Sequence, residues 1–452
     1  MAGRGAVRKR CGCITIDPDT GRKTQLGSKC PKLKRPSGGW SATHGTWTYT
    51  LGITDATGKR RQVSKSGFPT RDDAQAALDK VRAKHTQGIA VVDRPTVAEY
   101  LRDWMDMKRP HLKASSVSQY EGLIRRVLVP HLGRLRLDDL RQTHIRGAFD
   151  AYLSDPTRTR TRAGGRTTIK RCKAVLRSAL GDAMREGLVE RNVAALVKLP
   201  PAPSSKAVVW SRAHEARWRA EVARLMGEGH TVGQARKLAP RPSGVMVWSP
   251  MHLGQFLDHT ADHRLYALFF LLGTRGLRRG EVCALQWDDI DHDHSTLTIE
   301  RQCVMVDGRP MIDTPKSEAG TRTIALGKEG VDVLKAHRRR QAQERLALGV
   351  GDTKWMFTDD RGQRLNPTHL AYLFTRLVIS ADLPPIRTHD IRHTAATLML
   401  ASGSNAVTVR DTLGHSDVSL TLGVYSSLLE EVAQASADAV ASFIPRKART
   451  AP

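Results

Sequence analysis

The stretch at residues 388–399 reads THDIRHTAATLM, and it lies in the half of the chain that carries most of the reactive side chains. The apolar residues of this stretch recur at helical spacing, so we predict a helix that begins near Thr388. His389 and Arg392 are three residues apart and therefore share one face of that helix. An imidazole and a guanidinium on one face can move a proton and bind an anion.

A second group of polar residues lies upstream, where an apolar segment meets a turn. Residues 265–272 predict a strongly apolar helix that ends at Gly273, and the turn at 274–276 leads into RRGEVCALQW, a second helix that Arg278 opens. A buried element thus delivers an arginine to a helix N-terminus. Glu281 follows one turn later. It could orient the arginine, support the fold, or be a solvated helix carboxylate.

The segment between these two groups is predicted to be β-structure. The alternating runs TLTIERQCVMV and PMIDTP are joined by Asp307-Gly308, which is a hairpin signal, and TRTIAL predicts a third strand. Lys316 lies beside the turn before that third strand. Further on, Leu413-Gly414-His415 follows another helix, and Tyr425 comes ten residues later in LTLGVYS.

The composition favours nucleic acid as the partner. The chain has 452 residues, with 72 Lys and Arg against 45 Asp and Glu, and a formal net charge of +27. Such an excess repels itself in a compact protein unless a polyanion binds, and basicity for solubility alone is the weaker alternative. The longest apolar run is too short for a membrane span, which needs about 20 residues. Six cysteines without regular spacing do not resemble a secreted disulfide framework, so we expect a reducing cytosol and no membrane partner.

The N-terminal part of the chain is predicted to hold a basic region that contacts DNA and, after it, a helical bundle. Residues 1–92 begin with a net charge of +11 in the first 70 residues and continue with two short strands and a helix from Arg71 to Thr86. Residues 95–200 predict four amphipathic helices. A capping box of Thr96 and Glu99 opens the first of them, and Ser116 is predicted to open the second.

The remainder is predicted to be a linker and a catalytic domain. Residues 201–249 are interpreted as a linker or insertion with one charged helix from Arg212 to Gly227, between proline-rich stretches. Residues 250–445 hold the groups described above and an amphipathic C-terminal tail. The expected fold is multidomain and mainly α with small β-sheets: a helical domain and a mixed catalytic domain.

The polar groups of the C-terminal half, taken in order, resemble the catalytic constellation of the tyrosine recombinase (phage integrase) family. The residues that carry the resemblance are Arg278, Lys316, His389, Arg392, His415 and Tyr425. The resemblance covers residues 250–430 closely and residues 95–200 by arrangement, where the family has a helical core-binding domain. The N-terminal region resembles the arm-binding domains of integrases more loosely, and the match of Lys316 rests on position alone.

The resemblance implies a site-specific recombinase that cuts DNA without a metal or other cofactor. Tyr425 would be the nucleophile that forms a 3′-phosphotyrosyl link, with His389 accepting its proton and Lys316 protonating the leaving 5′ oxygen. Arg278, Arg392 and His415 would stabilise the charge that develops on the phosphate. These roles are what the family implies for the matching positions.

The resemblance also implies partners and a cellular setting. Double-stranded DNA with attachment sites would be bound by a homotetramer through a Holliday junction, with an excision or direction factor, in a bacterial cytoplasm at the nucleoid. Two alternatives stay open. A type IB topoisomerase would use similar chemistry to relax supercoils, and a DNA-binding regulator would bind without cutting.

A cysteine-rich segment near the N-terminus stands apart from this set. Cys11, Cys13 and Cys30, with His44 as a fourth candidate, could form a tetrahedral zinc site that fixes a basic segment without a core. The spacing is not a standard one, so a disordered basic arm with incidental cysteines is an equal alternative. The other three cysteines, Cys172, Cys283 and Cys303, lie on apolar elements and are predicted to be core residues.

Overall fold

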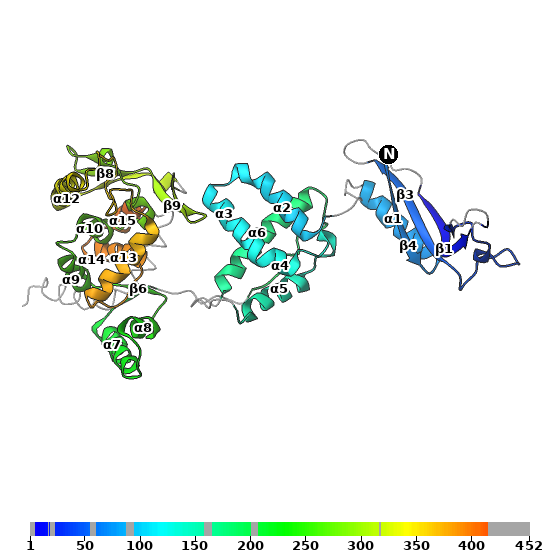
Figure 1. Ribbon diagram of the computed structural model, residues 1–452, viewed down its shortest axis with the longest axis horizontal. Helices are drawn as coiled ribbons and strands as arrows, with labels where there is room; N and C mark the ends of the chain where they lie inside the picture. The colour runs from blue at the N-terminus through cyan, green and yellow to red at the C-terminus, as the bar shows by residue number, and fades with distance from the viewer. Residues whose placement is uncertain are drawn as a thin grey trace, which may run out of the picture. The chain divides into compact units, whose positions relative to one another are not determined.

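The computed structural model describes residues 5–16, 18, 23–54, 60–86, 95–157, 165–199, 207–315 and 318–414. The chain divides into two compact units, Met1–Ala202 and Pro203–Pro452. Figure 1 shows the first unit in blue to cyan and the second in green to orange. Within the described ranges, no helix is both long and apolar enough to cross a membrane.

A four-stranded antiparallel sheet covered by one helix forms the first part of unit 1. Its strands lie in the order β2-β1-β3-β4, and helix α1 packs against β3. The elements are β1 (Ala6–Ile16), β2 (Lys23–Gly27), a 3-10 turn (Pro31–Leu33), β3 (Thr46–Thr54), β4 (Arg60–Phe68) and α1 (Arg71–Thr86). The predicted strands β3 and β4 and helix α1 are confirmed. The sequence does not predict β1, because consecutive basic residues at 8–10 interrupt the alternation that marks a half-buried strand. It does not predict β2, because KTQLG contains a single apolar residue, Leu26.

Packed helices form the second part of unit 1. They are α2 (Val97–Lys108), α3 (Ala114–Leu123), α4 (Val129–Leu132), α5 (Gln142–Ser154) and α6 (Arg166–Arg185), with 3-10 turns at Arg109–His111 and Leu137–Asp139 and a π-helical turn at Ile124–Leu128. The capping box of Thr96 and Glu99 is confirmed. The predicted start at Ser116 is wrong, because its backbone N–H already bonds to the carbonyl of Lys113, the N-cap of α3. Cys172 is fully buried, as predicted.

Unit 2 surrounds an apolar helix with further helices and short strands (Figure 1). Its first elements are β5 (Ala207–Val209), α7 (Arg212–Gly227), α8 (Val232–Leu238), β6 (Val245–Val247), α9 (Pro250–His259), α10 (Tyr266–Arg275) and α11 (Arg279–Val282). A 3-10 turn (Trp287–Asp289) and the strands β7 (Ile290–Asp291), β8 (Thr296–Ile299), β9 (Gln302–Val306), β10 (Arg309–Asp313) and β11 (Arg322–Ala325) follow, with a second 3-10 turn (Glu318–Gly320) before β11. The last are α12 (Gly327–Leu348), α13 (Pro367–Ser380), α14 (Asp390–Ala401) and α15 (Ala406–Leu413).

The strands of unit 2 form three small sheets. β8 lies between β11 and β7, β9 pairs with β10, and β5 runs parallel to β6. The hairpin at Asp307-Gly308 is confirmed. The run TLTIERQCVMV is not one strand, however, because the chain breaks the ladder at Glu300 and Arg301 and the two halves enter different sheets. Helix α10 also extends past Gly273 to Arg275.

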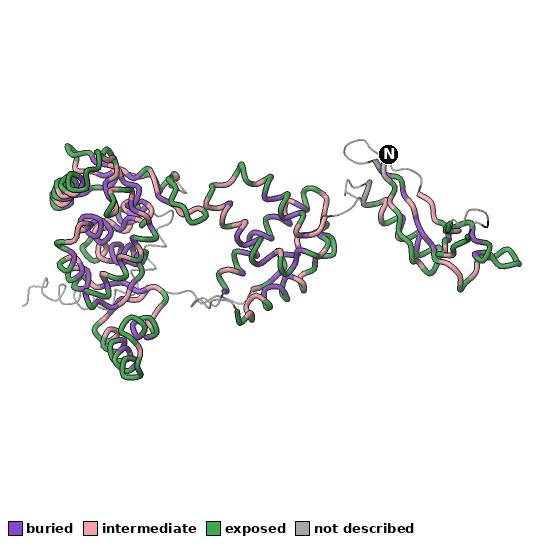
Figure 2. The backbone as a smooth tube through the Cα atoms, viewed as in Figure 1, coloured by how far each residue is buried: buried purple, intermediate pink, exposed green. Residues whose placement is uncertain are grey.

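The segment predicted to be a linker belongs to the hydrophobic core of unit 2. Trp210, Trp218 and Trp248 are almost completely buried and share one core with α10 and α13. The backbone N–H of Trp248 donates to the Thr394 hydroxyl at 3.1 Å, which ties β6 to α14. The linker interpretation is therefore corrected for residues 207–249, whereas the charged helix within them, α7, is confirmed. Figure 2 shows the buried backbone of α10 and α14 at the centre of the unit.

Candidate active site

Arg278 lies where the sequence predicts it, at the N-terminus of α11. Its backbone N–H and its Nη1 donate to the two carboxylate oxygens of Glu281, at 2.9 and 2.6 Å. Its Nη2 donates to the carbonyl of Gly414 at 2.8 Å. The side chain remains 34% exposed, so a guanidinium that is fixed on one edge still has N–H groups that solvent or a ligand can reach.

Arg392 is brought to the same place from α14. Its Nη1 donates to the carbonyl of Gly276 at 2.7 Å, and its Nη2 donates to the carbonyl of Leu413, the neighbour of Gly414. Burial and the charge of Arg278 lower the pKa of Arg392 to about 9, so the guanidinium stays protonated at neutral pH. Because only 2% of Arg392 is exposed, contact with a phosphate requires a local rearrangement.

Gly276 makes this approach of α14 to α10 possible. Its φ of +64° ends α10 in the left-handed conformation that favours glycine. A Cβ at this position would lie 2.4 Å from Leu413 Cδ2 and 3.2 Å from Ala395 Cβ. A larger residue would therefore push α14 and α15 away from the carbonyl that holds Arg392.

Glu281 holds Arg278 in place, and Arg322 in turn holds Glu281. Arg322, on β11, donates from Nη1 and Nη2 to both oxygens of Glu281, at 3.1 and 2.9 Å, and from Nε to the carbonyl of Thr412 at 2.7 Å. Burial alone would raise the pKa of Glu281, but the hydrogen bonds and charge of Arg322 and the charge of Arg278 hold it below its usual range. The carboxylate is thus ionised and 1% exposed, and the solvated-carboxylate interpretation is wrong.

We call the side chains of Arg278, Glu281, Arg322 and Arg392, together with the carbonyls that they contact, the arginine junction. Arg322 is a member of the junction that local sequence patterns do not reveal. Its strand is predicted, but nothing in TRTIAL distinguishes a buried, paired arginine from an exposed one. The signal that could have pointed to Arg322 is Glu281, 41 residues away, because a buried carboxylate requires a cationic partner.

His389 is the N-cap residue of α14, one turn before His393. The two rings meet edge to face with centroids 5.5 Å apart. Although the His389 ring keeps an exposed surface, the surrounding protein and the charges of His393 and Arg392 lower its pKa to about 4. The imidazole is therefore neutral at pH 7 and able to accept a proton.

Asp390 is the first residue of α14 and lies between these two histidines in the sequence. It is fully buried and accepts hydrogen bonds from Nε and Nη2 of Arg387 at 2.9 and 2.6 Å. The guanidinium thus satisfies a carboxylate that could not be buried alone. The sequence contains this pair within RTHD, but its role follows only from the burial of Asp390.

The structure therefore brings together three of the six residues that the family resemblance selects. Arg278 and Arg392 contact adjacent carbonyls, and the charge of Arg392 acts on His389. Lys316, His415 and Tyr425 lie outside the described residues. The described chain ends at Gly414, next to His415 and within the arginine junction.

The N-terminal cysteines form a second constellation, in unit 1. Cys11, Cys13, Cys30 and His44 offer sulfur and nitrogen atoms that all lie within 4.8 Å of one another. We call these four residues the Cys/His cluster. The cysteines predicted to be core residues, Cys283 and Cys303, are buried in unit 2 as expected.

A band of basic residues follows one face of α6. Its members recur at helical spacing and line an open groove of about 980 Å³: Arg166, Lys170, Lys173, Arg177 and Arg185. The groove also presents Thr167, Ser178 and Asn192, which are polar and uncharged. Cations and small polar groups along one helix face suit a phosphate backbone.

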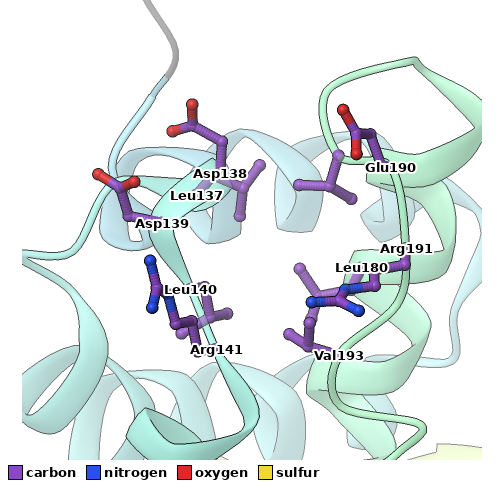
Figure 3. Close-up of a pocket in the computed structure, with 10 residues that line it drawn as sticks. Leu137, Asp138, Asp139, Leu140, Arg141, Leu180, Glu190, Arg191 and Val193 are labelled. Atoms are coloured by element: carbon purple, nitrogen blue, oxygen red, sulfur yellow. The ribbon is translucent and has the colours of Figure 1, made fainter.

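The helical part of unit 1 also has a cleft of mixed charge, with a volume of about 470 Å³ (Figure 3). Arg141 and Arg191 stand on opposite walls, whereas Asp138, Asp139 and Glu190 line one end. Carboxylates at this density repel a phosphate backbone, so the band on α6 is the better candidate for DNA contact.

Three family descriptions match successive parts of the chain. Residues 41–84 match the arm DNA-binding domain, residues 96–151 match the SAM-like N-terminal domain of phage integrases, and residues 251–431 match the phage integrase family. The last match contains every residue of the predicted catalytic set.

Named relatives agree with these matches. A tyrosine recombinase XerC-like protein of Caldanaerobacter subterraneus is 32% identical over 41% of this chain and 51% of its own length. The ICEBs1 integrase of Bacillus subtilis is 31% identical over 40% of this chain and 50% of its own, so the chain spans about half the length of each. An integrase of Streptomyces ambofaciens is 24% identical over 90% of this chain and 96% of its own.

A solved structure shows that the fold is similar as well. The Tn1549 transposon integrase, determined in complex with a circular intermediate DNA, covers 76% of this chain and 99% of its own with a TM-score of 0.55 at 18% identity. At that identity the likeness concerns the fold alone, which is multidomain and mainly helical with small sheets, as the sequence predicts.

Proposed function

This chain belongs to the phage integrase family of tyrosine recombinases, and on that basis we propose that it cuts and rejoins DNA at specific sites to integrate and excise a mobile element. The arginine junction is the observation that carries the proposal. Two guanidiniums from residues more than a hundred positions apart are held on adjacent carbonyls, and the 34% exposed side chain of Arg278 keeps N–H donors within reach of a ligand. Paired guanidiniums suit the non-bridging oxygens of a phosphodiester.

The reaction begins with attack of the Tyr425 oxygen on the DNA phosphorus. A phenol has a pKa of about 10 and is a weak nucleophile until its proton is removed. His389 is neutral at pH 7 and accepts that proton. The bond from phosphorus to the 5′ oxygen breaks, Lys316 protonates the leaving oxygen, and a 3′-phosphotyrosyl link remains.

Arg278, Arg392 and His415 stabilise the charge that builds on the phosphate in the transition state. Glu281 and Arg322 act only through Arg278 and are positioning residues. Reversal with a different 5′ hydroxyl joins the new strand, and the phosphotyrosyl bond conserves the energy that this needs. We assign no metal or other cofactor to the chemical steps.

We propose the division of roles that the sequence analysis expects: residues 1–92 for arm sites, 95–200 for core sites, and 250–445 for catalysis. The band on α6 is the proposed core-site surface in the second region. The segment 207–249 is part of the folded catalytic unit. We propose that a homotetramer acts on two double-stranded DNA sites through a Holliday junction, with an excision factor that sets direction, in a bacterial cytoplasm at the nucleoid.

The test is to express the full chain beside a library of candidate attachment sites and to sequence new DNA junctions. Junctions that depend on Tyr425 are expected. A regulator without catalysis would give none.

A second assay distinguishes the proposed recombinase from a type IB topoisomerase. The full chain is incubated with supercoiled plasmid that lacks any attachment site. Rapid relaxation without a site would favour the topoisomerase, whereas a recombinase is expected to leave the plasmid supercoiled.

A further inference from the structure

The Cys/His cluster combines residues from three separate segments of unit 1. Cys11 and Cys13 lie two apart on β1, so their side chains start from the same face of the strand. Cys30 is the N-cap residue of the 3-10 turn at Pro31–Leu33, and His44 precedes β3. The fold thus gathers the ligand atoms of residues up to 33 positions apart into one small volume.

The distances fit a tetrahedral metal site. With metal–sulfur and metal–nitrogen bonds of about 2.3 and 2.0 Å, a tetrahedron places neighbouring ligand atoms about 3.5–3.8 Å apart. The Nε2 atom of His44 lies 3.4 Å from Cys13 Sγ and 3.6 Å from Cys30 Sγ. All four ligand atoms lie within 4.8 Å of one another, so a small contraction completes the tetrahedron.

The backbone around the cluster is shaped to bring these side chains together. The pairing of β1 with β2 shifts register between Cys11 and Ile14, and such an irregularity redirects side chains. Next to His44, Gly45 has a φ of +72°, and a Cβ there would lie 2.6 Å from the carbonyl oxygen of Arg10. This close passage holds His44 against β1.

In the segment that carries Cys30 and His44, Leu33 is the one large apolar side chain that is buried. The apolar core of the sheet lies elsewhere, between Tyr49, Leu51 and Ile53 on β3 and Leu78 on α1. Residues 23–45 contain five Lys and Arg and no Asp or Glu, so the segment also repels itself. Small regions with so thin a core are typically stabilised by a disulfide or a metal.

We propose that Cys11, Cys13, Cys30 and His44 bind one structural Zn²⁺ ion. Three thiolates with a neutral imidazole are a common structural zinc set, and four protein ligands leave no open position for catalysis. Three thiolates and one Zn²⁺ carry one net negative charge, which offsets part of the basic charge around them. The ion closes residues 23–45 onto β1, and it does so independently of the recombinase activity proposed above.

Elemental analysis of the purified full chain tests the site directly. One zinc per chain is expected, and Cys13→Ala is expected to lose it. The matched control Cys303→Ala removes a buried thiol in unit 2 and is expected to retain the metal. Equal metal content in the wild type and Cys13→Ala, or a wild type without stoichiometric metal, would overturn the proposal.

A second measurement needs no variant and therefore does not depend on how well a variant folds. The wild-type protein is alkylated with and without a strong chelator, and each cysteine is followed by peptide mass spectrometry. Cys11 and Cys13 are only partly buried, so they are expected to react fast only after the chelator removes the metal. Fast alkylation without chelator, or a disulfide between two cluster cysteines, would contradict the site.

Discussion

The arginine junction and the Cys/His cluster hold their polar groups by different means. The junction lies within unit 2, whose apolar core extends over α7 to α14. Its buried carboxylate accepts hydrogen bonds from two guanidiniums, which also donate to backbone carbonyls. The cluster lies beside a sheet with a much smaller apolar core, in which partly buried side chains such as Val7 and Phe68 pack around the buried residues of β3 and Leu78. Where the core is large, packing brings distant elements together so that buried charges can pair with one another. Where it is small, we propose that metal–ligand bonds hold the elements together.

The proposed function assigns all bond-breaking chemistry to unit 2, and the largest expected effect tests this assignment. Tyr425→Phe is expected to abolish the covalent DNA adduct while leaving DNA affinity near wild type, because only a hydroxyl is removed. The adduct is measured on a denaturing gel, and affinity by titration. An adduct that survives would reveal a second nucleophile.

The proton donor is tested next. Lys316→Ala is expected to slow cleavage by the ~10²- to 10⁴-fold that is typical of a lost general acid. Sulfur in place of the bridging 5′ oxygen should restore cleavage by this variant, because a thiolate leaves without protonation. Arg392→Ala, the control, should gain much less, since its defect is at the non-bridging oxygens. Equal rescue of both variants would remove Lys316 from this role.

The arginine junction is expected to depend on its buried carboxylate for stability. Glu281→Ala leaves Arg322 buried without its partner and should lower the free energy of unfolding by about 3–5 kcal/mol. The control Glu221→Ala breaks an ion pair with Arg224 on the surface of α7 and should cost at most about 1 kcal/mol. Denaturant unfolding measures both. Similar losses would mean that the junction is not held by its ion pairs.

Unit 1 is expected to contribute mainly to binding. A truncated protein of residues 95–452 should still cleave core-site DNA, but the fall of its log K with log salt should be shallower, because fewer phosphate contacts release counterions. Binding titrations at several salt concentrations give the slope. An unchanged slope would contradict the arm-site assignment of residues 1–92.

The smallest effect concerns pH. The pKa of His389 is about 4 in the folded chain and about 6.5 when unfolded, so the unfolded state binds more protons between these values. The stability that neutral His389 contributes is present above pH 6.5 and is lost as the pH falls towards 4. The Tm of His389→Gln should therefore fall less from pH 7 to pH 5 than that of the wild type or the exposed control His131→Gln. Parallel Tm curves would contradict the lowered pKa.

Much of the fold follows from local patterns in the sequence. Helices α1 and α7, the capping box at Thr96 and the hairpin at Asp307-Gly308 are all predicted correctly, because each depends on residues a few positions apart. Strand β1 is missed because its charged residues obscure the alternation, and β2 is missed because it has a single large apolar residue. The segment 207–249 is misread because its prolines suggest a linker, whereas its three tryptophans are buried in the core of unit 2.

The sequence by itself determined the order of the reactive groups and placed Arg278 and His389 at helix N-termini. Only the tertiary structure decided which of these groups meet. Arg278 reaches Gly414 across 136 residues, Arg392 reaches Gly276 across 116, and Arg322 reaches Glu281 across 41. The physical reason is the short range of the local signals, because hydrophobic periodicity and helix caps depend on residues only a few positions apart. The burial that makes Glu281 require Arg322, and that brings His44 to Cys13, exists only after distant segments have packed together.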